Sequence, residues 1–138
     1  MGDKSEREGT TKYAVKKINS YLTAPKPDYK SALLLSAIYA EIRLRTLLTD
    51  WVSPPKDRRK ETGKLFNLKF NGLINRCKHH KLLDGKERKT LDELRKKRNQ
   101  LAHETALWKK LPTKEKKNIA LLCKSTIQFL KRTTYPAP

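Results

Sequence analysis

The stretch that decides the fold is residues 95–103, which read RKKRNQLAH. On a helix over residues 86–104, at about 100° per residue, the apolar side chains form one stripe and Arg98 falls near its centre. That stripe consists of Leu91, Leu94, Leu101, Ala102 and Thr105. Desolvating a guanidinium costs several kcal/mol unless it is paired and hydrogen-bonded. We therefore expect Arg98 to have a partner, either inside the fold or in a functional site.

A second segment, residues 29–52, is apolar around most of its circumference, which predicts a central, buried helix. Glu41 interrupts this segment, and Arg45 lies one helical turn further on. Two arrangements follow from this spacing. Glu41 can face Arg98, directly or across a dimer interface, or it can pair with Arg45 at i,i+4 and leave Arg98 to find another partner.

The remaining apolar residues recur at helical spacing, so the sequence predicts an all-α bundle of four or five helices without a sheet. A first helix begins at Thr10 or Thr11 and ends before Pro25, a short third helix ends over residues 76–81, and the last helix covers about residues 114–131. One domain then spans residues 11–132, between a flexible tail at 1–10 and another at 133–138. The expected core includes Leu34, Ile38, Leu48, Leu94, Leu101 and Ile127.

The charge of the chain is extreme, because 33 basic and 14 acidic residues give a net +19 over 138 residues. Self-repulsion of this size destabilises a compact state and favours a polyanionic partner, for which RNA is the leading candidate. A membrane is not expected, because there is no apolar run of spanning length and no basic amphipathic segment with aromatic anchors. The residues that could contact phosphates, or could simply form a solvated surface, are Lys56, Arg58, Arg59, Arg95, Lys96 and Lys97.

Neither cysteines nor histidines indicate a metal site or a cofactor. Cys77 and Cys123 lack a CxxC spacing, and no signal peptide is evident, so reduced, buried thiols in a cytoplasmic protein are expected. His79 and His80 are adjacent and would point about 100° apart on a helix, which does not suit chelation of one ion. We expect both histidines to be exposed.

Residues 82–103 resemble the signature of the HEPN superfamily, which places an Arg, a polar residue that is often Asn, and then a His late in a core helix. Arg98, Asn99 and His103 match this pattern, with four residues between the Arg and the His. The long helix that contains Glu41 is also similar to the first core helix of the family. The resemblance covers roughly residues 28–130.

This resemblance implies an α-helical bundle that forms a homodimer, with two copies of the motif in one cleft at the two-fold axis. It also implies a metal-independent endoribonuclease, of the kind found in toxin and antiviral-defence systems, that uses the RNA 2′-OH as nucleophile. Such chemistry needs a group that titrates near neutrality, here His103, and a fixed cation for the phosphorane charge, here Arg98. Asn99 would orient His103 or a phosphate oxygen, and Glu41 and Arg45 would supply supporting charge.

Other family members have lost catalysis, which implies an alternative function as a non-catalytic module that binds RNA or assembles with a protein. A purely structural helical domain would explain a pair between Arg98 and Glu41 but not the net charge. Members that are paired with an antitoxin usually carry a Tyr two residues after the His. The residue here is Thr105, so regulation by modification of such a Tyr is not supported. A protein partner or antitoxin that acts in another way stays among the partners that the resemblance implies.

Overall fold

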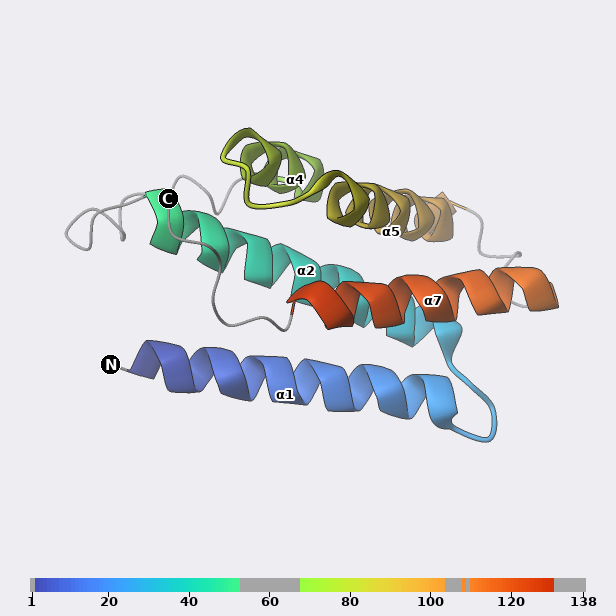
Figure 1. The fold of residues 1–138 in the computed structure, drawn as a ribbon. Coiled ribbons are helices and arrows are strands. Elements are labelled where there is room, and N and C mark those ends of the chain that lie inside the picture. The colour runs from blue at the N-terminus through green and yellow to red at the C-terminus, as the bar shows by residue number, and fades with distance from the viewer. Residues whose placement is uncertain (1, 53–67, 104–107, 109, 131–138) are drawn as a thin grey trace.

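The computed structural model describes the backbone of residues 2–52, 68–103, 108 and 110–130, and side chains at 12–49, 68–100, 108 and 110–130. Within these ranges the protein is an all-α bundle of five long helices without a strand, as predicted. In Figure 1, α2 runs through the middle of the bundle, with α1 on one side and α4 and α5 on the other. None of the described helices is both long enough and apolar enough to cross a membrane.

The first helix, α1, covers Gly2–Thr23 and therefore begins earlier than the sequence predicted. Residues 2–9 were expected to be a tail because they lack periodic apolar positions. They contain no proline and several good helix formers, so the helix can extend toward the N-terminus despite the low helix propensity of Gly9. The predicted helix start at Thr10 or Thr11 is thus too late, while the flexibility predicted for residues 1–10 stays a prediction. The second predicted tail, residues 133–138, lies outside the described residues.

The central helix, α2, covers Tyr29–Val52, the same bounds as predicted. Asp28 begins it, because its carboxylate accepts hydrogen bonds from Ser31 N at 3.0 Å and from Ser31 Oγ at 2.7 Å. This helix contacts each of the other four described helices. The prediction that residues 29–52 form the central helix is confirmed.

Helices α4 (Phe70–His79) and α5 (Gly85–His103) form a helical hairpin. Lys81 adopts a left-handed backbone conformation with φ of 58° in the turn between them. A capping box then begins α5, because Glu87 N donates to Asp84 Oδ1 at 2.7 Å and Asp84 N donates to Glu87 Oε1 at 3.0 Å. These local signals fix where α5 starts, and therefore how its side chains meet α2.

The last helix, α7 (Thr113–Leu130), packs on α1, α2 and α5. Its end is held by Arg43, which is 6% exposed and whose Nε donates to the carbonyl oxygen of Leu130 at 3.0 Å. The contact ties α2 to the last described turn of α7.

The expected core was correct in part. Leu48, Leu94 and Ile127 are buried, whereas Leu34 and Ile38 are 37% and 53% exposed. The side chain of Leu101 lies outside the described residues. The error concerns one face of α2, since Ile42 on the same face is also 42% exposed. We call Leu34, Ile38 and Ile42 the apolar stripe of α2.

Candidate functional site

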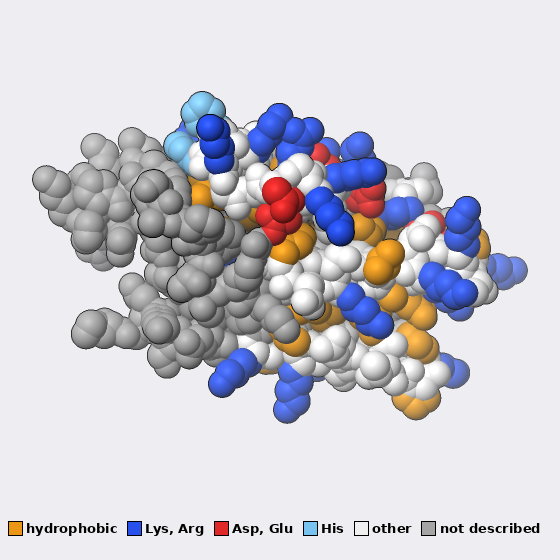
Figure 2. Space-filling model, viewed as in Figure 1, with side chains coloured by type: hydrophobic (Ala, Val, Ile, Leu, Met, Phe, Trp, Pro, Cys, Tyr) orange, Lys and Arg blue, Asp and Glu red, His pale blue; other side chains and the backbone are white. Residues whose placement is uncertain are grey.

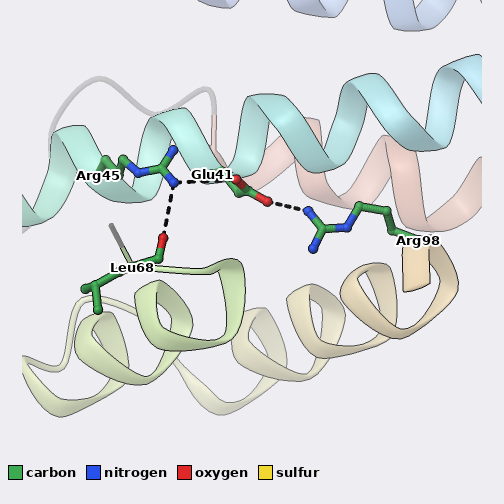
Figure 3. A network of polar contacts seen from close by, with 4 residues as sticks. All are labelled: Glu41, Arg45, Leu68 and Arg98. Carbon is green, nitrogen blue, oxygen red and sulfur yellow. Dashed lines mark hydrogen bonds and ion pairs between the residues drawn. The ribbon is translucent and has the colours of Figure 1, made fainter. Parts of the chain in front are cut away.

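Glu41 lies between two guanidinium groups (Figure 3). Arg98 Nη1, from α5, donates to Glu41 Oε1, and Arg45 Nη2 is 3.6 Å from Glu41 Oε2. Arg45 Nη2 also donates to the carbonyl oxygen of Leu68 at 3.2 Å. We call Glu41, Arg45 and Arg98 the Glu41 cluster. Glu41 therefore pairs with both arginines at once within one chain, where the two pairs were expected as alternatives.

The cluster lies where α2, α4 and α5 meet. The guanidinium carbon of Arg98 is 5.2 Å from the centroid of the Phe70 ring, so the charge rests over an aromatic face from α4. The side chains of Glu41, Arg45 and Arg98 are 22%, 26% and 28% exposed. Arg98 is thus partly buried, as its position on the apolar stripe of α5 predicts, but it keeps access to solvent.

Two cations share one anion in the cluster, which leaves it with a net charge of +1. Arg98 Nε and Nη2 make no hydrogen bond to any described residue. A guanidinium has five N–H donors in a planar fork that suits phosphate oxygens. The cluster therefore holds Arg98 in place while leaving part of its donor set for an anion.

The other two motif residues follow Arg98 along α5. Asn99 is exposed, and His103 is the last residue of the helix. The side chain of His103 lies outside the described residues. The backbone places His103 five residues beyond Arg98 on α5.

The predicted phosphate-binding residues differ in how far their charges are already paired. Arg95 and Lys97 are half-buried and ion-paired: Arg95 Nε is 3.9 Å from Asp92 Oδ1, and Lys97 Nζ contacts Glu115 Oε1 of α7. Lys97 therefore links α5 to α7, whereas Arg95 pairs within α5, and both charges are partly neutralised.

Lys96, by contrast, is exposed and forms no ion pair with a described residue. Among the predicted phosphate-binding residues on α5, Lys96 therefore has the charge that is most accessible to a ligand. The other three predicted phosphate-binding residues, Lys56, Arg58 and Arg59, lie outside the described residues.

Arg43 is the charged residue that sequence reasoning missed. It is more buried than either Arg45 or Arg98, and it ties α2 to the end of α7. The available signal was that residues 29–52 are apolar on nearly every face, so any charge among them had to be partly buried. The sequence offered no way to identify a backbone carbonyl 87 positions away as its partner.

The cysteines and histidines of the described residues form no site of their own. Cys77 and Cys123 are free and buried, as expected, and burial raises the pKa of their thiols to about 12 and about 11. His79 is exposed, while His80 is half-buried and lies edge-on to the His79 ring at 5.1 Å between centroids. No group of three metal-ligating side chains occurs in the described part of the chain.

Comparison of the chain with models of protein families, with curated proteins and with solved structures gave no match. Any assignment of function therefore rests on the residues of this chain and on the motif they resemble.

Proposed function

We propose that this protein is a metal-independent endoribonuclease of the HEPN type that works in the cytoplasm as a homodimer. The observation that carries the proposal is the Glu41 cluster, because it holds Arg98 at the start of the motif with Nε and Nη2 available to an anion. The net charge of +19 supports RNA as the partner.

The proposed reaction follows from the donor set. The 2′-OH of one nucleotide attacks the adjacent phosphorus, the bond to the 5′-oxygen of the next nucleotide breaks, and a 2′,3′-cyclic phosphate and a 5′-OH are formed. His103 transfers the proton, because imidazole titrates near neutrality. Arg98 stabilises the charge on the phosphorane oxygens, and Asn99, which is exposed, orients His103 or a phosphate oxygen.

The apolar stripe of α2 supports the homodimer. Ile38 and Ile42 flank Glu41 in the sequence, and both are exposed together with Leu34. An exposed row of apolar side chains beside a polar cluster is typical of an interaction surface. A second copy on this stripe would cover it and bring a second Arg98 toward the first.

The decisive experiment incubates the purified protein with RNA in excess EDTA and analyses the ends of the products. We expect 2′,3′-cyclic phosphate ends from the wild-type protein and no cleavage by His103→Ala. His79→Ala is the matched control, because it removes an exposed histidine from α4 and should leave activity unchanged. Wild-type activity in the His103→Ala protein would exclude the assignment.

A non-catalytic RNA-binding or protein-assembly module is the second candidate. It is favoured by the pairing of Arg98, Arg95 and Lys97 with carboxylates, which makes these residues structural as well as cationic. This module would bind RNA without cleaving it. Its affinity for RNA would still fall as the salt concentration rises. The slope of log affinity against log salt concentration would be about −0.7 for each neutralised phosphate of a single strand.

A further inference from the structure

A pocket of about 450 Å³ lies at the end of the bundle where α1 connects to α2 and where α7 begins. Figure 2 shows Lys and Arg side chains around this end of the molecule, with hydrophobic side chains among them. The pocket combines two aromatic rings with four basic side chains. We call it the Trp108 pocket, and its relevant lining residues are Tyr29, Trp108, Lys26, Lys30, Lys110 and Lys116.

The four lysines outnumber the one acidic residue of the pocket lining, which leaves the lining with a net charge of +3. All four are exposed, and none forms an ion pair with a described residue. Asp28 is the acidic residue of the pocket lining, but its carboxylate is occupied at the start of α2. The hydrogen bonds from the Ser31 hydroxyl and amide, with a smaller effect from the charge of Lys30, lower the pKa of Asp28. This carboxylate stays ionised and offsets one lysine, so three positive charges of the lining are left for an external anion.

Trp108 adds a polar group with no partner among the described residues. Its ring packs against the hydrophobic core, while its Nε1 is buried and makes no hydrogen bond to any of them. A buried indole N–H usually has an acceptor. The orientation of the indole is therefore not fixed by a hydrogen bond to any described residue. Turning the ring toward a ligand would break no hydrogen bond to these residues.

We propose that the Trp108 pocket is a subsite for one nucleotide unit of single-stranded RNA, with its base on Tyr29 or Trp108 and its phosphates near the lysines. Aromatic platforms beside basic side chains are the common way to bind single strands without sequence preference. The inference rests on the RNA-binding part of the proposed function.

Tyr29 and Glu41 are both on α2, which places the pocket about 18 Å along the helix axis from the Glu41 cluster. The pocket is therefore separate from the motif and would anchor the strand beside the proposed cleft.

The experiment measures binding of a fluorescent single-stranded oligouridylate to the His103→Ala protein in EDTA, so that cleavage is not required. Trp108→Leu should weaken binding by about tenfold to a hundredfold, because it removes a stacking surface. Trp108→Phe keeps a ring and should retain most of the affinity. Circular dichroism checks that each variant is folded. Unchanged affinity in a folded Trp108→Leu protein would overturn the proposal.

A second pair of variants tests the charges. The double variant Lys26→Gln, Lys30→Gln should make the slope of log affinity against log salt concentration less steep by about 1.4. This is the value for two lost phosphate contacts. Lys12→Gln with Lys16→Gln is the control, because it removes the same charge from exposed positions on α1. Equal slopes for the two double variants would contradict a phosphate role for the pocket.

A free nucleotide carries the same base and phosphate groups as an RNA strand, so it is the alternative ligand for the pocket. Competition by uridine monophosphate as effective as that by the oligonucleotide would assign the pocket to free nucleotides and overturn the anchoring role. The absence of any RNA binding by the His103→Ala protein would also overturn it. Loss of cleavage alone tests the proposed reaction and leaves these binding results unaffected.

Discussion

Glu41 and Arg98 lie 57 positions apart in the sequence and form an ion pair between α2 and α5. The same carboxylate faces Arg45 with its other oxygen. One side chain therefore joins the helix that carries the motif to the central helix, and it does so with the residue proposed to contact the phosphate.

A double-mutant cycle on this pair should show energetic coupling. We expect Glu41→Ala and Arg98→Ala each to destabilise the fold, and the double variant to cost less than their sum. The pair is about a quarter exposed, so the coupling should fall between exposed and fully buried pairs, at about 1–3 kcal/mol. Urea denaturation measures it. Additive effects would show that the contact contributes nothing to stability.

Substitution on the apolar stripe of α2 should change assembly rather than folding. Ile38 is 53% exposed, so Ile38→Asp should leave the monomer folded while preventing a second copy from covering the stripe. Leu121→Asp is the control, because Leu121 is 65% exposed but lies on α7. Sedimentation velocity should show a dimer for the wild-type and Leu121→Asp proteins and a monomer for Ile38→Asp. A dimer for all three proteins would show that the dimer interface does not include the apolar stripe of α2.

The cap of α2 should contribute stability that depends on pH. Because the Ser31 hydrogen bonds lower the pKa of Asp28 below 3.8, folding is favoured by the ionised carboxylate. Its contribution is complete above the ordinary pKa and is lost as the pH falls through the lowered one. Asp28→Ala should cost about 1 kcal/mol at pH 7. In urea titrations the difference from wild type should shrink below pH 3.8. A constant difference would mean that the charge of Asp28 does not matter.

Both thiols should be inert in the folded protein. Burial raises the pKa of Cys77 to about 12 and that of Cys123 to about 11, so almost no thiolate exists at neutral pH. Labelling with a disulfide reagent should reach both cysteines in denaturant and neither in native buffer on a short timescale. Rapid labelling of the native protein would indicate that the packing around α4 or α7 opens easily.

The fold was predictable where local chemistry decides it. Asp28 and the two prolines before it mark the start of α2, and the apolar periodicity around Leu91 and Leu94 marks the buried face of α5. The pairing of Glu41 with Arg98 was one of two arrangements that the sequence left open, because both charges interrupt apolar faces. These arguments use only neighbours within a few helical turns.

The errors arise where tertiary packing decides the outcome. Leu34 and Ile38 are as apolar as buried leucines, and periodicity could not reveal that the other helices leave this face of α2 uncovered. The contact of Arg43 with Leu130 O also required knowledge of where α7 ends in space. The Trp108 pocket was missed because its residues come from separate parts of the sequence.

The central position of α2 has a consequence for how the protein unfolds. Because α2 contacts every other described helix, the amides in the middle of α2 should lose their protection only when the whole bundle opens. Hydrogen exchange should therefore be slowest around Ala40 and Leu44, which are fully buried next to Glu41. The residues that hold Arg98 belong to the last part of the molecule to come apart.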